Sequence, residues 1–174
     1  MKQALHQDLF KVGIFFLVSM LMGWAIDQWR PRPLPQVYHS PAHRLDRQVE
    51  KISPAAATEP AEPAHIDLEA FRRWVFEKRG VIVDARADLF YQMGHVPGSL
   101  SLPRETFDKD YERQRDRLEE NKRQPFVVYC SDVSCEDSRL VAKALMRLGY
   151  VPVFVYPGGW NEWTGHSLPV ERER

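Results

Sequence analysis

The stretch that decides the fold is PFVVYCSDVSCEDSRLVAKALMRLG, residues 125–149. It opens with Pro125–Tyr129, a short and mainly apolar run that is typical of a strand buried on both faces. Apolar residues then recur at helical spacing from Leu140 to Leu148, and Gly149 marks the end of that helix. A buried strand, a loop and an amphipathic helix in this order predict one strand–helix unit of an α/β fold with a parallel sheet.

The same alternation extends on both sides of this stretch. Val81–Val83 predicts a second buried strand, and Val151–Tyr156 predicts a third. Asp67 can cap a helix whose apolar residues share one face, namely Leu68, Phe71 and Val75. Residues 104–124 hold seven basic and seven acidic side chains among 21 residues, which predicts a solvated surface helix. We therefore expect residues 66–174 to form a small parallel sheet flanked by helices.

The N-terminus carries a long apolar stretch. Val12–Ile26 contains no charged residue, and Leu9–Phe10 extend the stretch past a single lysine. A helix needs about 20 apolar residues to cross a bilayer, so the sequence predicts one transmembrane anchor within residues 1–30. A cleaved signal peptide is the alternative, since Gly23–Ala25 is similar to a small-x-small cleavage site.

A proline-rich segment follows the apolar stretch. Seven of the 13 prolines fall between Pro31 and Pro63, and alanine is frequent among them. Such chains are extended and semi-rigid, so we expect residues 31–65 to be a linker. A short helix over residues 42–51 is compatible with the pattern but is not required by it. The expected domains are therefore an anchor (1–30), a linker (31–65) and a globular domain (66–174).

The charges of the chain are balanced, with 24 Lys and Arg residues against 24 Asp and Glu residues. This balance argues against a nucleic-acid partner, because proteins that bind nucleic acids carry a surplus of basic residues. Basic residues flank both ends of the apolar stretch and do not decide its orientation. From the very short N-terminal tail we expect a single-pass protein of the bacterial inner membrane, with its domain on the periplasmic side. We expect a monomer because no association stripe is evident.

Cys130 lies where a predicted buried strand meets the loop before a helix. Ligands of open α/β sheets bind at the carboxyl ends of strands. The partial positive charge of a helix N-terminus lowers the pKa of a nearby thiol and favours the reactive thiolate. Cys130 is therefore a candidate nucleophile, and a buried inert cysteine is the alternative.

Three sequence blocks, in order, resemble the rhodanese (sulfurtransferase) family. The first is VDAR (83–86) followed by GHVPGSL (94–100) and Pro103, which is similar to a family pattern D-x-R…G-H-I-P-G-A…P. The second is VVYC (127–130) with its loop and helix, and the third is GGW (158–160), Trp163 and LPV (168–170). Each block alone is a weak signal, but their order and spacing agree over residues 66–171.

The resemblance implies a small parallel sheet with helices on both faces, and sulfur transfer as the activity. In active members a cysteine thiolate takes up a sulfane sulfur, becomes a persulfide and passes the sulfur to an acceptor. By position the persulfide cysteine is Cys130. The loop around it, with backbone N–H groups turned toward anionic sulfur, would comprise Ser131, Asp132, Val133, Ser134, Cys135, Glu136, Asp137 and Ser138. Such covalent catalysis needs no metal or cofactor, so we expect none.

The implied partners are a small sulfur donor or a persulfide-bearing protein, together with a thiol acceptor. Three carboxylates in the loop would oppose a dianionic donor such as thiosulfate, namely Asp132, Glu136 and Asp137. The loop is longer than in common sulfurtransferases, and Arg139 lies too far from Cys130 for the arrangement of the phosphatase-like relatives. Asp84, Arg86 and His95 are expected to be supporting residues that mainly brace the structure around the site.

Cys135 is the other unusual residue of this loop. It lies five residues after Cys130 and could resolve the persulfide, releasing the sulfur and leaving a disulfide. Alternatively it packs as a small apolar residue. Two functions therefore compete with sulfur transfer: a thiol–disulfide relay through Cys130 and Cys135, and a non-catalytic rhodanese-like binding module.

Overall fold

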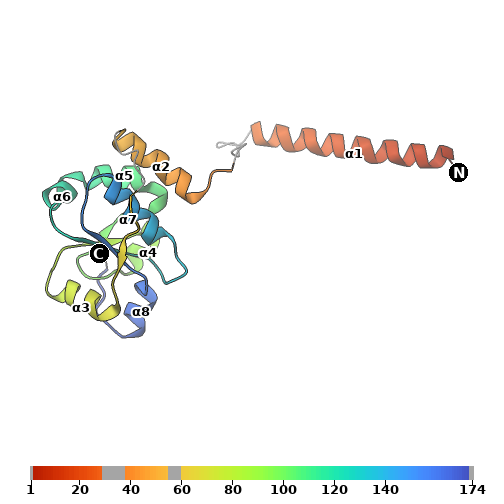
Figure 1. Ribbon diagram of the computed structural model, residues 1–174. Coiled ribbons are helices and arrows are strands. Elements are labelled where there is room, and N and C mark those ends of the chain that lie inside the picture. The colour runs from red at the N-terminus through yellow and green to blue at the C-terminus, as the bar shows by residue number, and fades with distance from the viewer. Residues whose placement is uncertain (1, 29–37, 55–59, 173–174) are drawn as a thin grey trace. The chain divides into compact units, whose positions relative to one another are not determined.

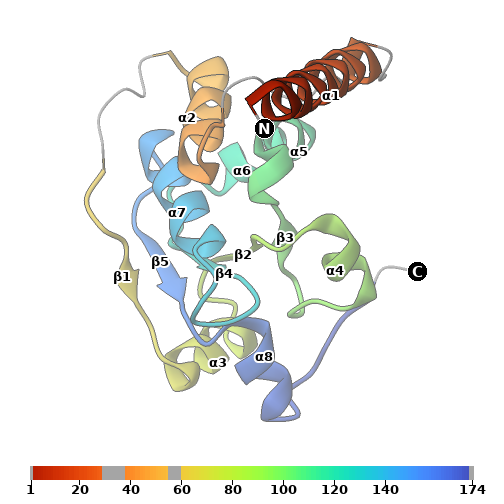
Figure 2. The ribbon, with the colours of Figure 1, turned by 90° about the vertical axis from the view of Figure 1, so that its right-hand side faces the viewer.

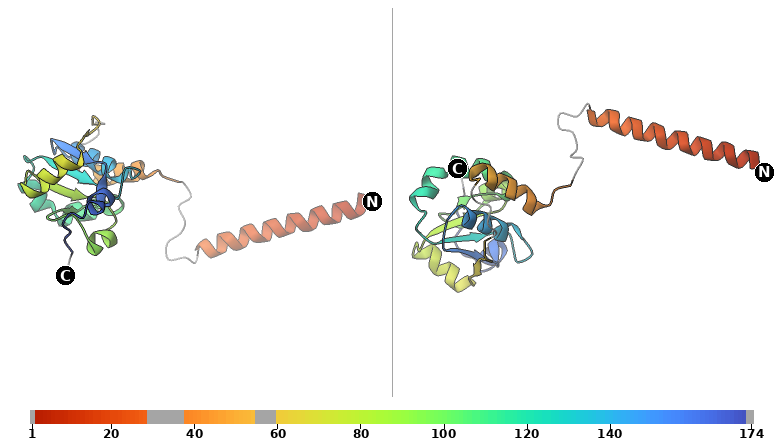
Figure 3. Two further views of the ribbon diagram at one scale, coloured as in Figure 1. Left: turned by 90° about the horizontal axis from the view of Figure 1, so that it is seen from below. Right: turned by 45° about the horizontal axis from the view of Figure 1, so that its top comes forward.

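The computed structural model describes residues 2–28, 38–54 and 60–172. The chain divides into two compact units, Met1–Tyr38 and His39–Arg174. The first unit contains helix α1 (Lys2–Gln28), which Figure 3 shows as a single unbroken helix. The second unit contains the sheet and every other described helix.

Helix α1 is long and apolar enough to cross a membrane over Lys11–Gln28. None of this window is buried within the structure. A signal sequence near an N-terminus meets the same criteria of length and composition. The end of the predicted anchor, Trp29 and Arg30, lies outside the described residues.

The second unit is built on a five-stranded parallel sheet with strand order β1-β5-β4-β2-β3. The strands are β1 (Ala64–His65), β2 (Val81–Asp84), β3 (Leu100–Ser101), β4 (Phe126–Tyr129) and β5 (Val153–Tyr156). Strand β4 lies at the centre, with Val128 opposite Val83 of β2 and Val155 of β5. Every residue of β4 is buried, which confirms the interpretation of this apolar run as a strand covered on both faces.

Helices cover both faces of the sheet (Figure 1). On one face lie α3 (Leu68–Phe76) and α8 (Gly159–Gly165). On the other lie α2 (Pro41–Ile52), α5 (Phe107–Arg113), α6 (Arg115–Glu120) and α7 (Asp137–Arg147). Helix α4 (Asp88–Met93) lies beside the β3 edge (Figure 2). The predicted α/β architecture is therefore confirmed.

Side chains along each strand pack alternately into two hydrophobic cores, because successive side chains of a strand point to opposite faces of the sheet. Val83, Val128 and Val155 pack with α2, α5, α6 and α7. Ile82 and Val127 pack with α3 and α8. At the start of α3, Asp67 accepts a hydrogen bond from the Ala70 amide at 2.8 Å, as its position before an apolar helix face predicted.

The charged segment 104–124 is not the single helix that its composition predicted. A 3₁₀ turn, η1 (Arg104–Thr106), precedes α5, and Gln114 separates α5 from α6. The side chain of Gln114 donates to the Ser101 carbonyl at 2.5 Å, which ties this junction to the end of β3. The apolar stripe of the segment is fully buried or nearly so, and comprises Phe107, Tyr111 and Leu118.

Helix α2 lies inside the segment that the proline content predicted to be a linker, residues 31–65. Its N-cap Ser40 accepts a hydrogen bond from the His43 amide, and Pro41 occupies the first turn, where a missing N–H costs nothing. Leu45 and Val49 are buried at 2% and 1% exposure in the same core as α7. The compact unit thus begins at His39, well before the expected boundary at residue 66.

Polar contacts fix α2 to the turn that precedes α5. Gln48 donates from Nε2 to the carbonyls of Arg104 and Glu105 at 3.4 and 3.3 Å. Its Oε1 accepts from the Asp108 amide at 3.0 Å. One side chain of α2 therefore holds the backbone of η1 and of the start of α5, and η1 carries Arg104 to the site described below.

We expect Leu45→Ala to lower the free energy of unfolding of the domain by about 2–5 kcal/mol, because it removes a buried side chain from the core. Glu50→Ala, on the exposed face of the same helix, is the matched control and should change stability little. Urea unfolding of the full chain in detergent, followed by tryptophan fluorescence, measures both. Equal effects of the two substitutions would show that α2 does not pack against the domain.

Candidate active site

Cys130 directly follows β4 at the carboxyl edge of the sheet and is 3% exposed. It lies in the wall of a pocket of about 160 Å³. Residues just after β2, residues of η1, the loop after Cys130 and the start of α7 contribute to the wall, among them Arg86, Arg104, Cys135 and Asp137. The pocket is at the place where parallel α/β sheets bind their ligands.

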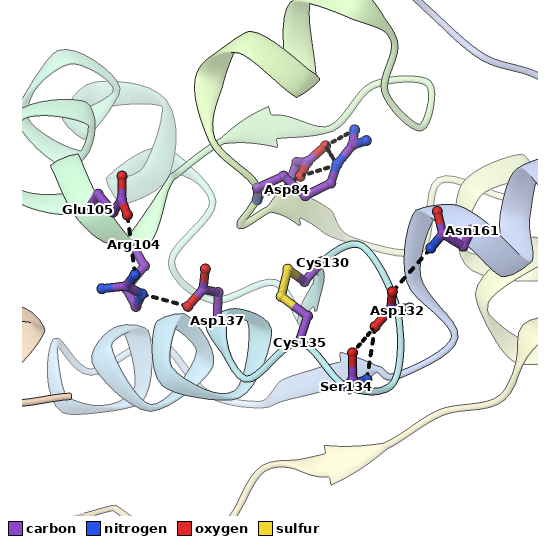
Figure 4. Close-up of a disulfide and its surroundings, with 10 residues drawn as sticks. Asp84, Arg104, Glu105, Cys130, Asp132, Ser134, Cys135, Asp137 and Asn161 are labelled. Atoms are coloured by element: carbon purple, nitrogen blue, oxygen red, sulfur yellow. Dashed lines mark hydrogen bonds and ion pairs between the residues drawn. A yellow bond between two sulfur atoms is a disulfide. The ribbon is translucent and has the colours of Figure 1, made fainter. Parts of the chain in front are cut away.

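Cys130 and Cys135 form a disulfide in the folded domain, with a Cα–Cα distance of 6.2 Å (Figure 4). Both cysteines line the pocket. The loop between them therefore brings the second sulfur to the first without opening the sheet or either core. This is the geometry that a resolving thiol requires.

Asp132 organises the loop between the two cysteines. Its Oδ1 accepts hydrogen bonds from the Ser134 amide at 2.9 Å and from the Ser134 hydroxyl at 2.6 Å. These hydrogen bonds hold the pKa of the Asp132 carboxyl below its ordinary value. The Cys135 amide donates to the Asp132 carbonyl at 3.1 Å. The amides of Ser134 and Cys135 thus bind Asp132, so in this disulfide form they are not turned toward sulfur as the resemblance implied.

Helix α7 begins at Asp137, so Asp137 and Ser138 belong to its first turn and not to the loop that was expected to reach Ser138. The apolar face begins only at Leu140 because the first turn is polar. Ser138 belongs to α7 and its side chain is buried. The N-cap residue is Glu136, whose side chain makes no capping hydrogen bond. The connection between β4 and α7 is therefore shorter than the sequence pattern indicated.

Arg104 is the site residue that sequence reasoning missed. It is only 8% exposed, and its Nε donates to Asp137 Oδ1 at 2.5 Å (Figure 4). The one signal for it is its place directly after Pro103, the last residue of the first family-like block. Arg104 fixes the carboxylate at the start of α7 beside the two cysteines.

Asp84 and Arg86 form a buried ion pair at 2.6 Å behind the pocket. The Tyr129 hydroxyl donates to Asp84, and Arg86 donates to the Gly94 carbonyl at 2.8 Å. Burial lowers the pKa of Arg86, but the hydrogen bond and charge of Asp84 outweigh it and raise the pKa overall. Burial raises the pKa of Tyr129 well above its ordinary value. Arg86 also lies over the Trp160 ring at 4.3 Å, so the pair braces the pocket from behind.

His95 lies away from the residues that line this pocket. Its ring stacks on Tyr91 at 3.8 Å, and its Nδ1 lies 2.9 Å from the Tyr91 carbonyl. Its backbone pairs with Glu171 near the C-terminus. These contacts agree with a bracing role for His95.

The N-terminus of α8 supports the start of the active-site loop. The Trp160 and Asn161 amides donate to the carbonyls of Cys130 and Ser131 at 2.8 and 2.9 Å. Gly159 has a φ of +62°, and a Cβ there would lie 2.5 Å from the Cys130 carbonyl oxygen. Glycine at this position therefore allows the close approach that holds Cys130 in place.

We expect Asp84→Asn to lower the free energy of unfolding by about 3–5 kcal/mol, because it leaves the Arg86 charge buried without its partner. Glu77→Gln is the matched control, since Glu77 pairs with Arg79 on the surface, where both side chains are about half exposed. Urea unfolding curves of the two variants give the comparison. A loss in Asp84→Asn no larger than in the control would contradict the bracing role.

Comparison with known proteins agrees with this architecture. The family model for the Rhodanese-like domain matches residues 67–166. The chain is 31% identical over 102 residues to the uncharacterized protein YibN of Escherichia coli K12, covering 58% of this chain and 66% of that protein. It is 34% identical over 100 residues to the tRNA uridine(34) hydroxylase of Erwinia tasmaniensis, covering 54% of this chain and 27% of that protein. The similarity thus spans less than two thirds of these relatives.

Solved structures share the fold at low sequence identity. The BH2092 protein from Bacillus halodurans superposes with a TM-score of 0.55 at 20% identity, covering 76% of this chain and 87% of that one. The rhodanese-like domain of the Alr3790 protein from Anabaena gives a TM-score of 0.52 at 23% identity, covering 65% of this chain and 81% of that one. Since the family model covers more than half of the sequence and the sheet and helices match, the chain belongs to the rhodanese-like domain family.

Proposed function

We propose that the protein is a membrane-anchored sulfurtransferase that carries sulfane sulfur as a persulfide on Cys130. The observation that carries the proposal is the position of Cys130, in the wall of a pocket at the carboxyl end of the central strand. This is also the position that matches the persulfide cysteine of the family. Helix α1 provides the anchor, and we place the domain on the periplasmic side of a bacterial inner membrane.

Loading begins with the Cys130 thiolate, which attacks the outer, sulfane sulfur of a donor. A bond forms between Cys130 and that sulfur, and the bond from the sulfur to the donor breaks. The leaving group keeps the electron pair and departs as a thiolate or, from thiosulfate, as sulfite. An acceptor thiolate then attacks the outer sulfur of the persulfide and takes it, which returns Cys130 to the thiolate.

Cys135 offers a second way to discharge the persulfide. Its thiolate attacks the Cys130 sulfur, hydrosulfide leaves, and the Cys130–Cys135 disulfide forms. The sulfane sulfur is reduced to sulfide while the two cysteines are oxidised, so the electrons balance. The Cys130–Cys135 disulfide of the structure is the bond that this step would form, and an external dithiol reductant would return the enzyme to its starting state.

The charges around the pocket favour a donor of low charge. The two arginines of the pocket wall are already paired, Arg86 with Asp84 and Arg104 with Asp137. The loop adds Asp132 and Glu136 without any basic residue between Cys130 and Ser138. Since Glu136 pairs with Arg139, Asp132 is the loop carboxylate that opposes an approaching dianion. We infer that organic persulfides of low charge load Cys130 faster than thiosulfate does, and that added salt narrows this difference in loading rate.

We expect the reduced Cys135→Ser chain to gain the mass of one sulfur atom after exposure to polysulfide, because it can load Cys130 but cannot resolve it. Cys130→Ser should not gain sulfur. The wild-type chain should pass on to the disulfide, losing two hydrogen atoms and releasing one sulfide. Intact mass spectrometry of the full chain in detergent measures all three. Absence of sulfur uptake in Cys135→Ser would overturn the persulfide proposal.

The disulfide itself favours a second candidate, a thiol–disulfide relay. In that case the reduced wild-type chain should lose two hydrogen atoms on exposure to glutathione disulfide and should release no sulfide on exposure to polysulfide. The Cys135→Ser chain should gain no sulfur from polysulfide. The same mass measurement and a sulfide assay distinguish the two functions. A chain that reacts in neither way would be a binding module.

A further inference from the structure

A third metal-ligating side chain lies beside the two cysteines. Cys130, Cys135 and Asp137 each place a possible ligand atom within 4.8 Å of the others. We propose that the reduced form of this site binds a soft divalent cation of the zinc class, through two thiolates and the Asp137 carboxylate. This goes beyond sulfur transfer, because the same pocket would then hold either a metal ion or a persulfide.

The ligand set suits this class of metal. Thiolates select soft cations, and zinc combines cysteine sulfur with carboxylate oxygen in tetrahedral sites. Zn–S bonds of about 2.3 Å place two sulfur ligands about 3.8 Å apart in a tetrahedral site. Reduction of the disulfide frees the two sulfur atoms, and rotation about the side-chain bonds can supply this separation across a Cα–Cα distance of 6.2 Å.

Asp137 is held in place for this role before any metal arrives. Figure 4 shows Asp137 between Arg104 and the disulfide, with the 2.5 Å hydrogen bond from Arg104 Nε on its far side. Outer partners of this kind orient ligating carboxylates in metal sites. Two thiolates and one carboxylate carry three negative charges, and Arg104 carries one positive charge. A divalent cation would therefore bring this group of charges to zero.

The chain supplies three ligands, so the fourth position of a tetrahedral site stays open. All three ligating residues line the pocket, and the open position would therefore face it. Metal binding releases the thiol protons to solvent and occupies the Cys130 thiolate. The disulfide, the persulfide and the metal complex are thus three mutually exclusive states of one pair of cysteines.

No metal was expected from the sequence, because two cysteines cannot make a four-cysteine zinc site. Asp137 was considered only as a loop carboxylate that opposes anions. Its position in the first turn of α7, facing both sulfur atoms, changes that interpretation. The negative charge that repels a dianionic donor is the charge that attracts a cation.

Cobalt is a suitable probe because thiolate ligation gives it a charge-transfer absorption band. We expect the full chain in detergent, reduced with a phosphine under anaerobic conditions, to bind one Co²⁺ with this band, and Zn²⁺ to displace it. The oxidised chain should show no band. Asp137→Asn and Cys135→Ser should each weaken binding by at least about tenfold. Glu136→Gln is the matched control, since Glu136 is an exposed carboxylate of the same loop that pairs with Arg139.

The proposal is overturned if the reduced wild-type chain shows no band, or if Glu136→Gln weakens binding as much as Asp137→Asn does. Circular dichroism of each variant checks that the domain is folded. If the Asp137→Asn variant unfolds, the Cys135→Ser variant alone tests the proposal. An affinity of Cys135→Ser for Co²⁺ equal to that of the wild-type chain would contradict the metal site. Sulfur uptake is measured separately on the metal-free chain. A failure of metal binding therefore does not contradict the persulfide proposal, and a failure of sulfur uptake does not contradict the metal site.

Discussion

The site depends on the pairing of β4 with parallel strands on both sides. Because β2 and β5 hydrogen-bond to β4 in register, the last residue of the ladder, Tyr129, lies opposite Asp84 and Tyr156. The three strands therefore end side by side at the same edge of the sheet. Cys130 is the next residue after β4, and its carbonyl accepts a hydrogen bond from the N-terminus of α8. A cysteine one residue earlier would lie in the sheet and one residue later in the loop. The strand register therefore sets the position of the Cys130 sulfur.

Charge pairing decides which chemistry this position can support. The two cations of the pocket wall are each bound to a carboxylate, so the pocket presents little free positive charge to an anion. The loop directs amides of Ser134 and Cys135 to Asp132, away from sulfur, while it closes the disulfide. Both features favour exchange between sulfur atoms over the binding of oxyanions. Under the proposed function, reduction of the disulfide opens the site to a donor.

Features that depend on local sequence pattern were predicted correctly from the sequence. Features that depend on contacts between distant parts of the chain were not. The apolar runs of β2, β4 and β5 and the spacing of α7 indicated the fold, and the place of Cys130 after β4 followed from them. A short helix over residues 42–51 was compatible with the sequence, but its place in the domain was not predicted. Leu45 and Val49 are a minimal apolar face among prolines, and only the surface that they cover makes α2 a helix of the domain. Arg104 was missed because its partner Asp137 lies 33 residues away, a pairing that only the folded sheet brings together.

The most direct test of the account is to locate the added sulfur on the reduced chain. Brief exposure to polysulfide, trapping with iodoacetamide and digestion with trypsin would give the peptide Gln124–Arg139, which holds both cysteines. Fragment ions that divide this peptide at Asp132 assign the sulfur to one side or the other. The account predicts that the sulfur is on Cys130. Sulfur on Cys135, or two alkylated thiols with neither a disulfide nor released sulfide, would contradict it.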